Sequence, residues 1–249
     1  MKFELVFRHW DLFLSGVWVT LHLTALALII GFMIALPAAL SLTRRSRFSP
    51  LVRGYVYFFR GTPLLVQTYL IYYGLAQFEF VRESWAWFFL REAWWCALIA
   101  FSLNSGAYTA EILRGAIATT PKGEIDGAKA LGLSERQVTW LILLPSALRR
   151  ALPQYGNEVV FMLHGTVVAS IITIQDILGV GRTVNAKYYI AYEGLLSAAA
   201  LYMVITFTLV WVFRRVEKRY LRHLDMDFGT TGKKPGKVAG ADAGVPQMR

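Results

Sequence analysis

Long apolar stretches separated by short charged segments dominate this chain. A helix needs about 20 apolar residues to cross the hydrocarbon core of a bilayer, which is roughly 30 Å thick. Stretches that reach or approach this length run over residues 15–43, 51–78, 93–110, 151–175 and 194–213. The second is interrupted by the segment Arg60-Gly61-Thr62-Pro63. This pattern predicts an all-α, polytopic membrane protein with about five transmembrane helices.

Basic residues collect in alternate loops. Residues 44–53 hold four arginines and no acid, whereas acids outnumber bases over 79–92. Bases dominate again over 111–150 and 214–222, whereas the loop expected over 176–193 holds only two bases, Arg182 and Lys187. Because cytoplasmic loops carry the excess of Lys and Arg, the pattern places the N-terminus outside and the C-terminus in the cytoplasm. The formal net charge of +10 is therefore mostly a topology signal, which makes nucleic-acid binding a poor interpretation.

Composition agrees with a membrane-embedded body and a separate tail. The chain is 56% hydrophobic with a mean hydropathy of +0.45, and its single cysteine excludes an internal disulfide. We expect one transmembrane domain over residues 1–228. Residues 229–249 are rich in Gly, Lys, Pro and Ala without an apolar period, which predicts a disordered cytoplasmic tail.

The long cytoplasmic segment carries helix punctuation. Thr120 reads as an N-cap before Pro121, and Gly132 ends a short amphipathic helix at about 121–132. Ser134 and Gln137 form the pattern of a capping box for a second helix. On physical grounds the pair is either a hairpin resting on the membrane surface or a docking element for a soluble partner.

The segment contains Asp126-Gly127-Ala128, then Gly132, and then Ile-Leu-Leu-Pro at 142–145. This pattern resembles the cytoplasmic loop motif of bacterial ABC importer permeases. That motif is usually Glu-Ala-Ala, three residues, Gly, nine residues, and Ile-x-Leu-Pro. The chain has the same spacing in Asp126-Gly127-Ala128, Gly132 and 142–145. Asp126 replaces the usual Glu, and Gly127 replaces the usual Ala. Asp keeps the charge on a shorter arm, whereas Gly weakens a helix by up to about 1 kcal/mol.

The resemblance covers about nine tenths of the chain. It extends through 60–67 and 104–114 to 157–164, and it looks most similar to a membrane subunit of histidine, lysine, arginine and ornithine or opine uptake systems. It implies an ABC type I importer permease fold in a bacterial inner membrane and the import of a basic amino acid or an opine. The implied partners are an ATP-binding subunit dimer, a second homologous permease subunit as a heterodimer, and a periplasmic solute-binding protein.

ATP chemistry is expected on a partner rather than on this chain. Residues 229–234 lack the spacing and the final hydroxyl of a Walker A loop. The resemblance therefore implies that ATP and Mg²⁺ bind the partner subunit, and that this chain is a transport subunit without a cofactor or metal of its own. The residues implied to couple it to the ATPase are Glu124, Asp126, Gly127, Ala128, Leu131 and Gly132. The alternatives are a channel or ion-coupled carrier acting alone and, less favoured, a membrane enzyme.

Polar residues inside the apolar stretches are candidates for substrate contact, because each is costly in hydrocarbon. Glu158 lies eight residues past Arg150, hence about 12 Å into the bilayer. A carboxylate there suits a cationic amino acid. The alternative is a structural pair with Arg60 or a hydrogen bond to a neighbouring helix. Family members often carry an acid seven residues further on, where this chain has Gly165.

Three further candidates are weaker. Thr62 and Gln67 flank the Gly-Pro interruption, where freed backbone groups can bind charged ligand ends if they line a cavity. A kink that only lets helices cross is the alternative. His164 is included as well, although it lies about 120° around the helix from Glu158, which favours a lateral bond.

Overall fold

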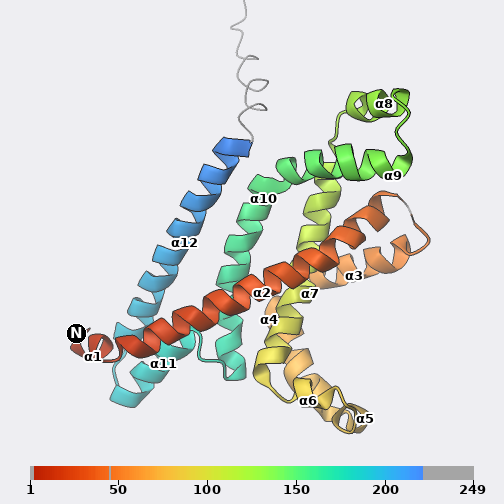
Figure 1. Ribbon diagram of the computed structural model, residues 1–249. Coiled ribbons are helices and arrows are strands. Elements are labelled where there is room, and N and C mark those ends of the chain that lie inside the picture. Colours follow the sequence, from red (N-terminus) through yellow and green to blue (C-terminus); the bar gives the residue numbers. More distant parts are fainter. Residues whose placement is uncertain (1–2, 45, 221–249) are drawn as a thin grey trace, which may run out of the picture.

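The protein is helical throughout the part that the structure describes. This computed structural model describes residues 3–44 and 46–220, and those residues contain no strand (Figure 1). The predicted all-α class is confirmed. The tail predicted at 229–249 lies outside the described residues.

The helices are numbered along the chain as in Figure 1. The first part contains α1 (Phe3–Arg8), α2 (Trp10–Thr43), α3 (Ser49–Gly61), α4 (Leu64–Tyr69), η1 (Leu70–Gly74), η2 (Leu75–Gln77), α5 (Glu79–Arg82), α6 (Trp87–Leu90) and α7 (Ala93–Ala118). The second part contains α8 (Lys122–Ala130), α9 (Glu135–Gln137), η3 (Val138–Leu143), α10 (Leu144–Gly165), η4 (Thr166–Ile172), α11 (Ile177–Tyr188) and α12 (Glu193–Tyr220).

Four helical segments of the described chain are long and apolar enough to cross a membrane. They are Trp10–Thr43, Ala93–Ala118, Glu135–Ile172 and Glu193–Tyr220. The remaining apolar stretch, residues 51–78, is divided among α3, α4, η1 and η2. Each of these pieces is too short to cross a bilayer as one helix.

The division of that stretch follows from Pro63. Thr62 takes the extended conformation, with φ −113° and ψ 144°, which is the geometry that a following proline favours. Pro63 has no N–H to continue the hydrogen-bond ladder, so α3 ends at Gly61 and α4 begins at Leu64. The predicted interruption is therefore a break between two helices.

Helix α7 is the central element of the fold. Its apolar window is 72% buried, against 6% for α12. α2 crosses α7 closely where Gly31 meets Gly106 and Ser105, and a Cβ atom at Gly31 would lie 3.1 Å from both neighbours. Small residues allow backbones to approach in this way inside membranes. The interior of the bundle is therefore organised around α7, and α12 lies at its periphery (Figure 1).

Residues 176–193, expected as a loop, contain a helix instead. Asp176 is the N-cap of α11, and its carboxylate accepts a hydrogen bond of 2.8 Å from the amide of Gly179. Tyr202 of α12 donates to the same carboxylate at 2.8 Å. Helix α11 packs against α2 and α12, so an N-cap and tertiary burial determine a segment that its charge pattern alone did not.

The contact between α11 and α12 requires glycine. A Cβ atom at Gly194 would overlap the carbonyl oxygen of Gly181 and the side-chain oxygen of Asn185. We therefore expect Gly194→Ala to lower the free energy of unfolding by about 2 kcal/mol. Thermal unfolding in detergent measures this. Gly54→Ala in α3 is the control: its site is open and helical, so the same change should be neutral or stabilising.

Candidate functional site

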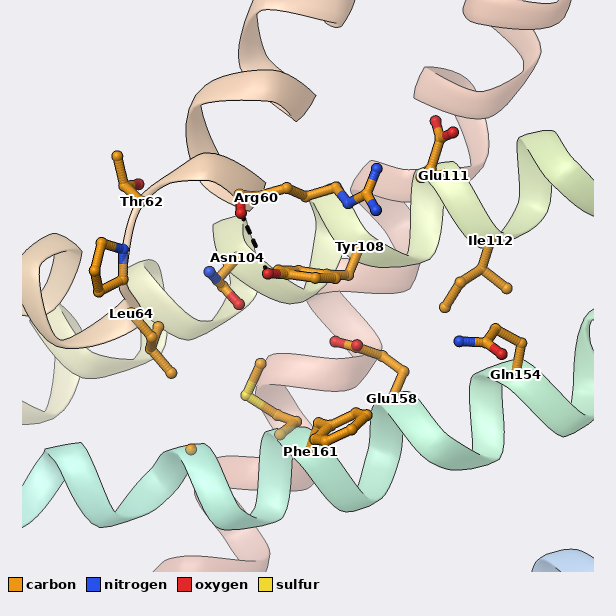
Figure 2. A pocket seen from close by; sticks show the side chains of 13 residues that line it. Arg60, Thr62, Leu64, Asn104, Tyr108, Glu111, Ile112, Gln154, Glu158 and Phe161 are labelled. Atoms are coloured by element: carbon orange, nitrogen blue, oxygen red, sulfur yellow. Dashed lines mark hydrogen bonds between the residues drawn. The ribbon is translucent and has the colours of Figure 1, made fainter.

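A cavity of about 650 Å³ lies between the break in the second apolar stretch and the helices α7 and α10. Figure 2 shows its lining side chains converging from these three sides. The lining residues are Arg60, Thr62, Pro63, Leu64, Asn104, Tyr108, Glu111, Ile112, Gln154, Glu158, Phe161, Met162 and Gly165. Of the four predicted substrate residues, the cavity brings together Glu158 and Thr62.

Two helix faces supply most of the polar groups. Asn104, Tyr108 and Glu111 are spaced by four and three residues on α7, so they lie on one face of that helix. Gln154 and Glu158 are four residues apart on α10 and point into the same space (Figure 2). The cavity therefore combines a mostly apolar wall with a few convergent polar groups, as ligand sites do.

Glu158 is the acid nearest the centre of this arrangement. The residue is only 6% exposed, and its carboxylate points from α10 towards Tyr108 (Figure 2). No basic side chain of the described residues lies within 4.0 Å of it, so the alternative of a direct ion pair with Arg60 is not realised. The charge of Arg60 still acts on Glu158 from farther away. A buried carboxylate without a close cation favours a cationic ligand.

Arg60 provides a positive charge on the opposite wall. Its guanidinium lies over the ring of Tyr108, 5.4 Å from the centroid, and its carbonyl oxygen accepts a hydrogen bond of 3.4 Å from the Tyr108 hydroxyl (Figure 2). The side chain runs along the cavity towards Glu111. The cavity thus presents a carboxylate at Glu158 and a guanidinium at Arg60, the two charges that complement an amino acid zwitterion.

Gln67 is engaged at the helix break instead of lining the cavity. Its side-chain amide donates to the carbonyl oxygens of Phe59 and Thr62, each at 2.9 Å, and to the hydroxyl of Thr62 at 2.7 Å. Asn104 donates to the Gln67 side-chain oxygen at 3.0 Å. In a continuous helix the amide of residue 63 would satisfy the Phe59 carbonyl, but proline has none. The Gln67 amide therefore replaces a missing backbone donor.

His164 also lies away from the cavity. Its ring nitrogen Nε2 is 3.0 Å from the hydroxyl of Thr206 on α12. Gly165, the position where relatives often carry an acid, does line the cavity, and a Cβ atom there would come within 2.9 Å of the Leu64 side chain. The lateral bond of His164 is the geometry that its angular offset from Glu158 favoured.

Several lining residues were absent from the predicted set. Asn104, Tyr108 and Gln154 were not singled out as site residues. Asn104 and Tyr108 lie on the same face of α7 as Glu111, and Gln154 lies four residues before Glu158 on α10. Glu111 was interpreted as the start of the cytoplasmic segment and as part of the resemblance over 104–114, but not as a site residue. The missing signal was periodicity: polar residues at i, i+4 and i+7 on an otherwise apolar helix mark a face that avoids lipid.

The long charged segment after α7 folds as a helical hairpin, formed by α8 and by α9 with η3 (Figure 1). Gly132 ends α8 in the left-handed conformation with φ +84°. Its amide donates to the carbonyl oxygen of Lys129, and the amide of Leu133 donates to the carbonyl oxygen of Ala128. These two hydrogen bonds form a Schellman motif. The capping box of Ser134 and Gln137 at the start of α9 is confirmed.

The N-terminal end of α8 differs from the prediction. Pro121 occupies the N-cap position instead of Thr120, and no side chain caps the helix. The Thr120 hydroxyl instead accepts a hydrogen bond from Arg150 of α10. Arg150 also donates to Ser146 at 2.8 Å, and Ser146 donates to Glu124 at 2.9 Å. These bonds connect α8 to the start of α10, so the hairpin is attached to a membrane-spanning helix.

The predicted coupling residues divide between two sides of α8. Ala128 is buried against the rest of the hairpin, and Glu124 is bonded to Ser146. Asp126, Gly127 and Leu131 are exposed, and the Leu131 side chain is 82% exposed. A Cβ atom at Gly127 would meet nothing within 4 Å, so this side of α8 is open. The outward side is therefore Asp126, Gly127 and Leu131.

An ion pair closes the hairpin in solvent. Lys129 Nζ lies 2.7 Å from a carboxylate oxygen of Glu135. This hydrogen bond lowers the pKa of Glu135 and raises the pKa of Lys129. The contribution of this ion pair to stability is fully present above the ordinary pKa of glutamate. It is lost as the pH falls through the lowered pKa of Glu135. Because both groups are exposed, the pair orients the hairpin more than it stabilises it.

Sequence comparison matches this architecture to a known family. Residues 24–222 match the family described as binding-protein-dependent transport system inner membrane component. The octopine transport system permease protein OccM of Rhizobium radiobacter is 41% identical over 221 residues, 87% of this chain and 90% of that protein. The histidine/lysine/arginine/ornithine transport system permease protein HisM of Escherichia coli strain K12 is 41% identical over 212 residues, 84% of this chain and 89% of that protein.

Solved structures agree with the fold. A crystal structure of an amino acid ABC transporter with histidines matches with a TM-score of 0.77 and 32% identity, covering 88% of this chain and 99% of that chain. The MetNI methionine ABC transporter in an inward-facing conformation matches with a TM-score of 0.71 at 18% identity, covering 84% and 96%, which supports the fold alone. The predicted ABC importer permease fold and the resemblance to amino acid permeases are confirmed.

Proposed function

Because this chain belongs to the family of binding-protein-dependent transport system inner membrane components, we propose that it is the permease subunit of an ATP-driven importer for basic amino acids or opines. The relatives named for octopine and for histidine, lysine, arginine and ornithine support this substrate class. The single observation that carries it is the buried Glu158 carboxylate on the wall of the cavity.

The charges of the cavity suit a cationic amino acid or an opine. Glu158 would bind the ammonium or guanidinium group of the substrate, and Arg60 on the opposite wall would bind a carboxylate. A charge-assisted hydrogen bond contributes about 1.5 to 3 kcal/mol, so the pair discriminates against a ligand that lacks either charge. Thr62 would border the substrate as a lining residue, while its hydroxyl donates to the Phe58 carbonyl and accepts from Gln67, which holds the helix break in shape.

The hairpin would couple ATP hydrolysis on the partner subunit to transport. In this proposal α8 docks on an ATP-binding subunit through Asp126, Gly127 and Leu131, while Glu124, Ala128 and Gly132 hold α8 in place. Closure of the ATP-binding dimer would then move α8, and the bond network to Arg150 would pass the movement to α10 and the cavity. ATP and Mg²⁺ would bind the partner subunits, and this chain would carry no cofactor.

The assembly and orientation follow the family. We expect a dimer of ATP-binding subunits on the hairpin side, a second homologous permease subunit in a heterodimer, and a periplasmic solute-binding protein on the other side. The N-terminus would be periplasmic and the C-terminus cytoplasmic, since the basic loops and the hairpin share one side. The loop that contains α11 would then face the periplasm.

Reconstitution tests the proposal. The chain is co-expressed with its neighbouring transport genes, purified by a tag on this subunit and placed in liposomes with the solute-binding protein. We expect ATP-binding subunits to co-purify with the chain. Radiolabelled arginine, histidine or octopine should accumulate only when ATP is supplied on the side of the ATP-binding subunits. Accumulation without ATP by the chain alone would instead support a carrier or channel, and absence of any captured ATPase would contradict the proposal.

A further inference from the structure

Glu111 borders two separate hollows. It lines the large cavity that contains Glu158, and it also lines a smaller hollow of about 410 Å³ together with Leu42, Arg53, Val56 and Arg114. Glu111 lies three residues beyond Tyr108 on α7, hence about 4.5 Å further along the helix towards the hairpin. Glu111 is therefore the acid that connects the cavity with the side on which α8 lies.

Glu111 forms an ion pair with an arginine of the same helix. Arg114, one turn further along α7, donates to both of its carboxylate oxygens, at 2.9 Å from Nε and 2.5 Å from Nη2. The side chains of Arg114 and Glu111 are 42% and 29% exposed, respectively. Both side chains are partly exposed, and Glu111 borders both hollows, so a cation in either hollow can reach its carboxylate. Such a cation can replace Arg114 by exchanging one charge-assisted pair for another, without leaving Glu111 unpaired.

We infer that Glu111 is a second binding position for the cationic group of the substrate, on its way from Glu158 to the hairpin side, and that Arg114 occupies this position when substrate is absent. The inference rests on the proposed function and deepens it. The substrate class is a solute with an ammonium or guanidinium group.

The electrostatics explain why a second acid is useful. A cation leaving Glu158 for an apolar wall would lose its counter-charge, which is costly in a membrane-embedded protein. Glu111 offers a new carboxylate on the neighbouring helix before the first is lost. Arg114 then returns to Glu111 as the substrate leaves, so the acid is neutralised in both states. Arg53, on the wall of the smaller hollow, can meet the substrate carboxylate.

Four variants of the full reconstituted complex test the inference. They are Glu111→Gln, Glu111→Asp, the double variant Glu111→Gln with Arg114→Gln, and the exchange Glu111→Arg with Arg114→Glu. The probe is whichever of arginine, histidine and octopine the wild-type complex imports fastest, followed as the initial rate of ATP-driven uptake. Glu79→Gln, on the exposed short helix α5, is the matched control for loss of one acid.

We expect Glu111→Gln and the double variant to slow uptake about tenfold, because each removes the carboxylate. Glu111→Asp should keep a larger share of the wild-type uptake rate, since it keeps the charge. The exchange variant restores the ion pair but places a guanidinium on the cavity wall, so it should also be slow. A purely structural ion pair predicts the reverse: the double and exchange variants would recover the rate. Size-exclusion chromatography with the ATP-binding subunits confirms that each variant assembles.

The outcomes separate the two proposals. A wild-type complex that imports none of the three probes overturns the proposed function, and this inference with it. A wild-type complex that imports, combined with an exchange or Glu111→Gln variant that keeps more than about half of its rate, overturns only the role of Glu111. If Glu111→Gln fails to assemble, the comparison of Glu111→Asp with the exchange variant decides.

Discussion

Glu158→Gln is expected to reduce import of a cationic amino acid about tenfold or more, because it removes the buried carboxylate while keeping the size and hydrogen-bonding of the side chain. A neutral amino acid carried by the same complex should lose much less, since it forms no charge-assisted bond there. The measurement is the initial rate of ATP-driven uptake of both substrates into proteoliposomes, each normalised to the wild-type rate.

The matched control is Gln154→Leu, one turn along the same face of α10, which changes the polarity of the cavity without removing a charge. It should affect the cationic and neutral substrates alike. Equal losses for both substrates in Glu158→Gln would mean that Glu158 holds the helices together rather than binding the cation, and the thermal stability of the variant would then fall as well.

Replacing residues 122–131 by a flexible Gly-Ser linker is expected to abolish uptake while leaving membrane insertion intact. The linker removes α8, whose bonds to Ser146 connect the hairpin with α10. Without a rigid helix no ATP-driven movement can reach the cavity. The measurement is uptake together with the amount of ATP-binding subunit that co-purifies.

A finer variant separates docking from folding. Leu131→Asp changes a side chain that is 82% exposed, so the stability of the isolated subunit should stay the same. We expect uptake to fall about tenfold if Leu131 packs into a partner, because a buried apolar contact of that size contributes about 1.5 to 3 kcal/mol. Wild-type uptake by Leu131→Asp would place the docking surface elsewhere, and wild-type uptake by the linker variant would reject the coupling role of α8.

Four of the five predicted apolar stretches fall on long apolar helices of the described chain, because lipid imposes a strong rule. A spanning helix must be long and apolar, and it must bond its own backbone. The four spanning segments overlap the stretches predicted at 15–43, 93–110, 151–175 and 194–213. The break at Pro63 was visible for the same reason, since proline lacks a donor. These are local properties of the chain.

Features that depend on tertiary contacts were less predictable. The segment that forms α11 was expected to be a loop, because its apolar side is short. That side is buried only through packing against α2 and α12, which the local sequence does not show. Thr120 carries the right chemistry for an N-cap, but Arg150, thirty residues away in sequence, occupies its hydroxyl. Competition between a local and a distant partner cannot be read from spacing alone.

The candidate site shows the same limit. Glu158 was found because a lone acid in an apolar stretch is conspicuous, and the structure places it on a cavity. Gln67 looked equally polar, but the carbonyls freed by Pro63 engage its amide. Tyr108 and Asn104 were missed because their helical spacing to Glu111, which puts all three on one face of α7, was not used. Which polar group faces the cavity is decided by the packing of three helices.

The peripheral position of α12 has a further consequence. Only 6% of its apolar window is buried within this chain, so nearly the whole face is left to acyl chains or to a neighbouring subunit. Where acyl chains cover α12, exchange among large apolar residues should cost little as long as hydrophobic length is kept. Phe207 and Val204, which are 65% and 60% exposed, are therefore positions at which a spectroscopic label would distinguish lipid from a neighbouring subunit.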